Sequence, residues 1–153
     1  MRIALDDLSH PAVAKLLQQH LDDMYLTSPP ESVHALDLDK LRAADIRFWT
    51  IWHNDSLLGC GALKLHSAEL AEIKSMRTDA EHRGKGVGAA MLQHIIDYAR
   101  QQGLLSLKLE TGSQAFFIPA HRLYQRFGFE FCSPFADYTD DPNSKFMCLQ
   151  LAP

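Results

Sequence analysis

The sequence lacks the features that mark several large classes of protein. Its net charge is -4 at pH 7, so it does not carry the basic excess typical of nucleic-acid binding. No apolar run approaches the roughly 20 residues that a helix needs to cross a bilayer. The three cysteines (Cys60, Cys132 and Cys148) are too far apart for a disulfide framework or a zinc site. We therefore expect a reduced cytoplasmic protein with no nucleic-acid and no membrane partner.

Two further absences narrow the class of site. The eight histidines show neither H-x-x-x-H nor H-E-x-x-H spacing, so no metal site is expected. The N-terminus, Met1–Asp7, turns acidic at once and lacks the apolar segment of a signal peptide. The rest is ordinary globular composition, with 153 residues, of which 46% are hydrophobic and 22% charged. This length predicts one domain, residues 1–153, around a single core.

Hydrophobic spacing predicts an α/β alternation. Apolar residues recur at helical spacing in Pro11–Met24 and Val87–Gln102, and Gly103 and Gly128 are suited to end helices. Residues 54–56 predict a hairpin turn. Strands are expected at 2–6, 48–52, 57–65, 71–78, 104–110, 129–132 and 145–151, and helices at 11–24, 38–44 (capped by Asp37 or Asp39), 87–102 and 119–127.

The most informative motif is Arg83–Gly88, R-G-K-G-V-G, between a predicted strand and a predicted helix. Its glycines lack a Cβ where the helix begins, so a ligand can approach the backbone closely. The first turn of a helix also has free N–H groups and the positive end of the helix dipole. Arg83 and Lys85 add formal positive charge. The motif therefore predicts a site for a phosphate or pyrophosphate group.

Three other interpretations of the motif are weaker. A Walker A loop needs four residues between its glycines and a Ser or Thr after its lysine, and both are missing. The dinucleotide pattern G-x-G-x-x-A is satisfied by Gly84, Gly86 and Ala89, with Glu110 ending a later strand. However, residues 79–83 separate the glycines from the strand, and too little chain follows for a doubly wound sheet. A plain glycine-rich turn does not need the two cations.

Two motifs together resemble the GNAT superfamily, the Gcn5-related N-acetyltransferases. Arg83, Gly86 and Gly88 match the family pattern R/Q-x-x-G-x-G/A, and residues 71–78 resemble the strand that precedes it. Leu123–Phe129 resembles the family signature LY-x-x-x-GF. The resemblance implies a mixed, mostly antiparallel sheet of six to seven strands. About four helices would flank that sheet, which would splay after its fourth strand.

The resemblance also implies acetyl-CoA as the acetyl donor. The backbone of Met76, Arg77 and Thr78 would pair with the pantetheine arm like an added strand. The pyrophosphate would be held by the motif residues Arg83, Gly84, Lys85, Gly86, Val87 and Gly88.

Two side chains are candidate catalysts. The tyrosine of the LY signature, Tyr124, is the expected acid for the departing thiolate, although such tyrosines also serve as core residues. Glu72 is the candidate base, because the histone-acetylating branch has its catalytic glutamate there; an ion pair or an ordered-water base are the alternatives. Strand alternation predicts Glu72, Lys74, Met76 and Thr78 on one face. The Met76 N–H is the expected donor to the oxyanion.

The acceptor site is expected between two loops, residues 28–34 and residues 134–144. In the second loop, Asp137 and Tyr138 are candidates to bind a cationic amine, although a solvated acidic loop is the alternative for its other carboxylates. The asparagine that many members carry before the LY tyrosine is absent. Phe116 and Phe117 stand in that region instead, as pocket wall or as core.

These features predict an N-acetyltransferase that moves an acetyl group to a primary amine of a small molecule or a peptide by direct attack on the thioester. The alternative is a noncatalytic acyl-CoA-binding module. The sequence leaves the oligomeric state open, a homodimer included.

Overall fold

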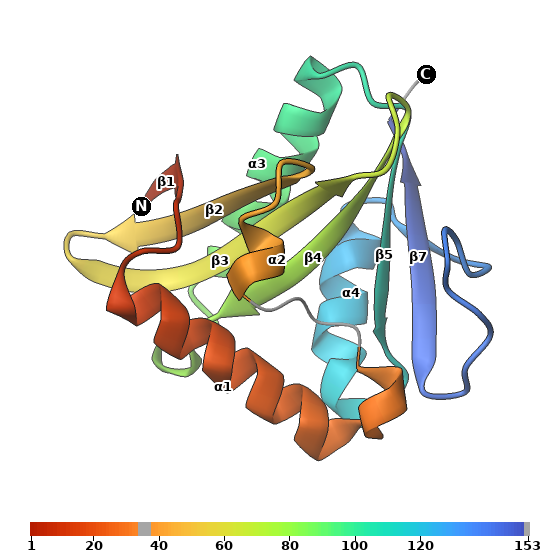
Figure 1. The fold of residues 1–153 in the computed structure, drawn as a ribbon, viewed down its shortest axis with the longest axis horizontal. Coiled ribbons are helices and arrows are strands. Elements are labelled where there is room, and N and C mark those ends of the chain that lie inside the picture. Colours follow the sequence, from red (N-terminus) through yellow and green to blue (C-terminus); the bar gives the residue numbers. More distant parts are fainter. Residues whose placement is uncertain (34–37, 152–153) are drawn as a thin grey trace.

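The computed structural model describes residues 1–33 and 38–151, as a seven-stranded sheet flanked by helices (Figure 1). The described part contains four α-helices and three short 3-10 turns. The strands are β1 (Arg2–Leu5), β2 (Ile46–His53), β3 (Ser56–Leu65), β4 (Leu70–Thr78), β5 (Ser106–Gly112), β6 (Glu130–Cys132) and β7 (Ser144–Gln150). The helices are α1 (Pro11–Thr27), α2 (Leu38–Leu41), α3 (Val87–Gln101) and α4 (Ile118–Arg126), and the 3-10 turns are η1 (Pro30–Ser32), η2 (Ala80–His82) and η3 (Ala115–Phe117).

The expected mixed, mostly antiparallel sheet is confirmed. The strand order is β1-β2-β3-β4-β5-β7-β6, and only β4 and β5 pair in parallel. Their ladder runs from Leu70–Ser106 to Ile73–Leu109 and then ends, although both strands continue. In Figure 1 the two strands diverge from that shared end. The sheet is therefore splayed after its fourth strand.

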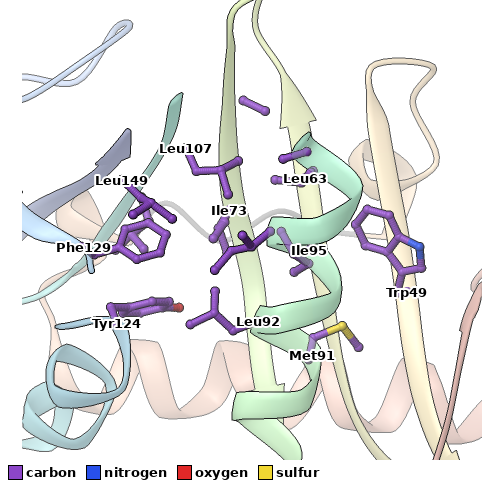
Figure 2. Packing of buried hydrophobic residues seen from close by; sticks show 14 of the residues in the cluster. Trp49, Leu63, Ile73, Met91, Leu92, Ile95, Leu107, Tyr124, Phe129 and Leu149 are labelled. Atoms are coloured by element: carbon purple, nitrogen blue, oxygen red, sulfur yellow. The ribbon is translucent and has the colours of Figure 1, made fainter. Parts of the chain in front are cut away.

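Two hydrophobic clusters hold the helices on opposite faces of the sheet. The larger joins α3 and α4 to the strands, and its members Met91, Leu92 and Ile95 are almost fully buried (Figure 2). The smaller cluster packs α1 and α2 against β2 and β3, through residues such as Val13 and Phe48. Figure 1 shows α1 and α2 in front of the sheet, with α3 and α4 behind it. No described helix is both long and apolar enough to span a membrane.

Local chemistry explains where the helices begin and end. The Nδ1 atom of His10 caps α1 by accepting a 3.0 Å hydrogen bond from the Ala12 N–H. This helix runs to Thr27 rather than Met24, and the Thr27 hydroxyl bonds the Asp23 carbonyl oxygen at 2.8 Å. Helix α2 stops at Leu41, short of the predicted residue 44. The predicted cap Asp37 lies outside the described residues, and Asp39 lies in the first turn of the helix.

A β-bulge in β4 overturns one prediction about which side chains share a face. The β3–β4 register moves from Ala62–Lys74 to Cys60–Arg77, so β4 has one extra residue, and Ser75 has a φ of 55°. The alternation therefore changes sides within the strand. Glu72 and Lys74 project from the α1 face, whereas Met76 packs into the α3-side cluster.

The same bulge places the end of the strand. A Cβ on Gly88, in α3, would lie 3.7 Å from the Thr78 hydroxyl, so Thr78 also points to the α3 side. Between the two, Arg77 returns to the α1 side and forms an ion pair with Asp23. The prediction that Met76 and Thr78 share a face with Glu72 is therefore wrong.

Candidate functional site

The Arg83–Gly88 motif forms an open turn before α3. Gly84 and Gly86 have φ values of 77° and 79°, a left-handed conformation that glycine adopts without strain. A Cβ on either residue would meet nothing within 4 Å, so free space lies above this backbone. Gly86 also precedes the first turn of α3, whose N–H groups have no partner inside the helix. The turn has the expected form of an anion site.

A groove of about 690 Å³ extends from this turn between the end of β4 and α4. Of the nine residues predicted to bind the donor, all except Lys85 line it: Met76, Arg77, Thr78, Arg83, Gly84, Gly86, Val87 and Gly88. The Lys85 ammonium instead lies 3.4 Å from the Nδ1 atom of His82. The geometry thus brings together most of the predicted donor-binding set.

Two arginines that the sequence analysis did not single out line the same groove. Arg122 and Arg126 are exposed and stand four residues apart on α4, so both lie on one side of the helix. With Arg77 and Arg83 they bring the arginines that line the groove to four, of which Arg77 is paired with Asp23. In the sequence, the spacing of Arg122 and Arg126, four residues apart around the LY signature, could have indicated this positively charged side of the helix.

A second, smaller hollow of about 120 Å³ lies where β4 and β5 separate. Glu72, Ser75 and Glu110 line it from the two strands. Its wall also includes Tyr124 and residues of α1 and η1. We refer to the larger hollow as the donor groove and to the smaller one as the inner pocket. The two share His20, Met24, Met76, Phe117, Ala120 and Tyr124, so they meet at these residues.

Tyr124 stands at this junction and belongs to the core as well. Its ring packs edge-on against Phe129 with centroids 5.5 Å apart, and Figure 2 shows the hydroxyl directed toward Leu92. The side chain is 7% exposed, and burial raises the pKa of the phenol well above its ordinary value. Its hydroxyl forms no hydrogen bond with the described part of the chain. A protonated donor is therefore available to a ligand at the junction.

Glu72 lines the inner pocket, but its carboxylate is held by a network of three side chains. Its carboxylate lies 2.9 Å from the Nε2 atom of His66, 3.2 Å from the ammonium of Lys74 and 2.6 Å from the hydroxyl of Tyr138. Its side chain is 3% exposed. The ion-pair alternative is thus present in the structure.

Glu110 is a pocket residue that the sequence analysis treated only as the end of a strand. It lies on β5 and lines the inner pocket opposite the β4 residues. Burial raises the pKa of its carboxyl to about 7, and the negative charges of Glu72 and Asp141 act in the same direction. Ser144 and Lys74 oppose the shift. A carboxyl whose charge changes near neutral pH therefore faces the pocket.

The predicted acceptor-binding residues lie in different places. Phe117 is buried at the junction of the two hollows, whereas Phe116 is 44% exposed. Tyr138 reaches inward to Glu72 and Lys74. Asp137 is exposed and lines an outer polar pocket of about 260 Å³ on the other side of Glu72. His34, in the first predicted loop, is outside the described residues.

A buried polar cluster joins α1 to β4 beside the junction. Arg77 forms its ion pair with Asp23, and in the described structure the Nε atom of Arg77 and the Nδ1 atom of His20 are buried without partners. Burial lowers the pKa of His20 to about 4, and the Arg77 charge acts in the same direction. His20 is therefore neutral at physiological pH.

One group of metal-ligand type occurs in the described residues. The ligand atoms of Asp79, Glu81 and His82 lie within 4.8 Å of one another. The Asp79 carboxylate already accepts the Glu81 N–H at 3.2 Å and thereby closes the η2 turn. This local role explains the proximity of the three side chains.

Comparisons with known proteins relate the chain to N-acetyltransferases. The chain is 54% identical over 151 residues to the uncharacterized N-acetyltransferase YsnE of Bacillus subtilis, covering 99% of this chain and 100% of the relative. It is 48% identical over 149 residues to the uncharacterized N-acetyltransferase YedL of Escherichia coli, covering 97% and 94%.

Solved structures share the whole architecture. An acyl-CoA N-acyltransferase structure from Klebsiella pneumoniae superposes with a TM-score of 0.78 at 27% identity, covering 99% of this chain and 97% of that one. A Bacillus subtilis acetyltransferase in complex with CoA gives 0.72 at 21% identity and covers 99% of both chains, which shows a common fold. The sequence model of the GNAT acetyltransferase family matches residues 13–129. The chain therefore belongs to the GNAT family and is a GNAT-type acyltransferase.

Proposed function

We propose that this protein is an acetyl-CoA-dependent N-acetyltransferase whose acceptor is a primary amine of a small molecule or a peptide. The observation that carries the proposal is the meeting of the donor groove and the inner pocket at Met76, Phe117 and Tyr124. A donor in the groove and an amine in the pocket would come together there. The continuous sheet supports one catalytic domain over residues 1–153.

The residues of the donor groove fit the chemistry of acetyl-CoA. The glycine turn leaves space above its backbone for a diphosphate, and Arg83, Arg122 and Arg126 supply positive charge beside it. Beyond Ile73, the edge of β4 that faces β5 has no ladder partner in the described structure. Such an edge suits the extended amides of a pantetheine arm. The residues 76–78 keep this proposed role.

Each step of acetyl transfer then has a candidate group. Bound acetyl-CoA supplies the thioester carbonyl that is attacked and the thiolate that leaves. The N–H of Met76 is the proposed donor to the negative charge that develops on the carbonyl oxygen. The hydroxyl of Tyr124 is the proposed acid, because the residue lines both hollows at their junction and its hydroxyl has no hydrogen-bond partner among the described residues. A carboxylate of the pocket takes the proton of the amine, whose pKa is about 10 in solution.

The test is to measure donor binding by calorimetry and free thiol release with acetyl-CoA and a panel of primary amines. Gly86→Glu would put a carboxylate into the anion site and is expected to abolish binding of acetyl-CoA. Gly103→Glu is the matched control, since Gly103 has a φ of 76° and open space but ends α3 far from the groove. Undiminished binding by the Gly86 variant, or no amine-dependent thiol release by the wild type, would contradict the proposal.

A further inference from the structure

We infer that Glu110 on β5, and not Glu72 on β4, is the base that accepts the proton of the acceptor amine, and that Glu72 is a positioning residue. This inference rests on the proposed function. It reassigns a role within that function and adds a residue that neither the family pattern nor the sequence analysis selected.

Both carboxylates line the inner pocket, but they occupy different positions relative to the splay of the sheet. Glu72 lies inside the parallel ladder, where it pairs with Lys108. Glu110 is the first residue of β5 after the last ladder pair, Ile73–Leu109. It therefore stands at the point where the strands part and the pocket opens.

Strand alternation sets the direction of the Glu110 side chain. Leu107 and Leu109 are buried in the α3-side cluster, so Lys108 and Glu110 project from the opposite face of β5. Pairing with Phe146 of β7 fixes this register on the far side of the strand. The sheet thus aims Glu110 into the inner pocket from β5.

The contacts of the two carboxylates also favour Glu110 as the base. Glu72 is held by His66, Lys74 and Tyr138, and taking up a proton there would weaken its ion pair with Lys74. Glu110 forms no ion pair with the described residues. Like Glu72, it shares the pocket lining with Tyr124, the proposed acid, and with Met76, the proposed oxyanion donor, but its carboxylate is not held in an ion pair with the described residues.

The surroundings of Glu110 suit proton transfer near pH 7. The charged or titratable groups that face it are Glu72 and Lys74 from β4, Asp141 from the loop before β7, His20 from α1 and Tyr124 from α4. Burial, with the two carboxylates, raises the pKa of Glu110 to about 7. A base with a pKa near the working pH is partly ionised and still basic enough to accept a proton.

The proton balance of the reaction is complete with these groups. The ammonium of the acceptor gives one proton to Glu110, which releases it to solvent. The free amine nitrogen attacks the carbonyl carbon, so that a C–N bond forms and the C–S bond breaks with its electron pair left on sulfur. Tyr124 donates its hydroxyl proton to that sulfur and regains one from the nitrogen. The products are an amide and the free thiol of coenzyme A.

The experiment compares Glu110→Gln and Glu72→Gln with Glu130→Gln, a matched control at an exposed position of β6. The acceptor is the amine of the panel that wild-type protein turns over fastest with acetyl-CoA. For Glu110→Gln we expect kcat/KM to fall by about 10²- to 10³-fold and the acidic limb of the pH profile near 7 to vanish. Calorimetric affinity for acetyl-CoA should stay within about twofold, and Glu110→Asp should retain the acidic limb.

Glu72→Gln should raise the KM of the amine and keep the acidic limb, while Glu130→Gln should match wild type. A readout independent of turnover is the ¹³C NMR titration of glutamate carboxyls. One resonance should titrate near pH 7 and be missing from the Glu110→Gln spectrum.

Three results would overturn the inference. They are a Glu110→Gln variant that keeps wild-type kcat/KM, an acidic limb that is lost in Glu72→Gln instead, and a Glu110 resonance that titrates near 4.5. If wild-type protein turns over no amine, the proposed function fails and the base assignment fails with it. If amines are turned over equally by wild type and Glu110→Gln, only the base assignment fails.

Discussion

The hydroxyl of Tyr138 lies 2.6 Å from the carboxylate of Glu72, to which it donates a hydrogen bond, although the residues are 66 positions apart. The ammonium of Lys74 completes the contact, at 3.0 Å from the same hydroxyl. The loop before β7 is thereby attached to the middle of β4. This contact separates the inner pocket from the outer polar pocket, because Glu72 and Lys74 line both.

Removing that hydroxyl should loosen the loop. Tyr138→Phe deletes two hydrogen bonds, one donated to the buried carboxylate of Glu72 and one accepted from the ammonium of Lys74, and should lower the free energy of unfolding by about 1.5 to 3 kcal/mol. Chemical denaturation followed by circular dichroism measures the change. The control is Tyr25→Phe, since Tyr25 is 56% exposed. Equal stability of the Tyr138 variant and wild type would contradict the network.

The hydroxyl of Tyr124 should matter for turnover and little for folding. It has no hydrogen-bond partner among the described residues, so Tyr124→Phe should change stability by less than about 1 kcal/mol. The loss of an acid should lower kcat by about 10²-fold or more. Tyr98→Phe is the control, because the Tyr98 hydroxyl accepts a hydrogen bond from Arg47 away from both hollows. A Tyr124 variant with wild-type kcat would remove the acid from the mechanism.

The arginines of α4 should contribute to donor affinity. Arg122→Ala and Arg126→Ala should each weaken acetyl-CoA binding by roughly 3- to 10-fold, because exposed charge pairs with phosphate are partly screened by water. The effect should shrink as salt is raised from 0.05 to 0.5 M in calorimetry. Arg100→Ala, at the exposed end of α3, serves as the control. Affinities that do not depend on either arginine would place the phosphates elsewhere.

The stability of Glu110→Gln relative to wild type should depend on pH. In the unfolded chain the carboxyl has its ordinary pKa of 4.5, whereas burial raises it to about 7 in the fold. Between these values the folded protein binds more protons, so wild-type stability falls as pH rises through this window. Glutamine cannot ionise, so the variant avoids the free-energy cost of a buried negative charge. It should be more stable than wild type at pH 8 by up to about 3 kcal/mol, with no such gain at pH 4. Denaturation midpoints at both pH values measure it.

His20 should change the pH dependence of stability in the opposite direction to Glu110, over nearly the same pH range. Its pKa is 6.5 when unfolded and about 4 in the fold, so the unfolded chain binds more protons between these values. The contribution of His20 to the free energy of unfolding is therefore fully present above pH 6.5 and is lost as the pH falls toward 4. The free energy of unfolding of wild-type protein should therefore fall between pH 6.5 and pH 4 by up to about 3 kcal/mol more than that of His20→Gln. A difference between variant and wild type that is constant from pH 4 to 8 would contradict the buried, neutral His20.

The fold, and the grouping of the proposed donor-binding residues in one groove, could be predicted from the sequence because their signals are local. Arg83–Gly88 and the LY signature are contiguous, and the hydrophobic periods located every strand and helix to within a few residues. Most of the predicted donor-binding residues come together because they are adjacent in the chain, at the end of β4 and the start of α3.

The acceptor side was harder because it depends on contacts between distant segments. The positive φ of Ser75 has no sequence signature, so simple alternation put Met76 on the wrong face. The enclosure of Glu72 requires Tyr138 from a loop far along the chain. Likewise, the exposure of Glu110 to the pocket follows from where the β4–β5 ladder ends, which no local pattern encodes.

Because β4 contains one extra residue at the bulge, deleting that residue should damage the protein far more than substituting it. Deleting one codon at Ser75 would restore regular alternation and invert every side chain that follows in the strand. Arg77 would be turned away from Asp23 into an apolar layer, and Met76 would be turned out of that layer. We therefore expect variants with a substitution at Ser75 to fold and a variant that lacks this residue not to fold. A mutational scan that includes single-residue deletions would measure this difference.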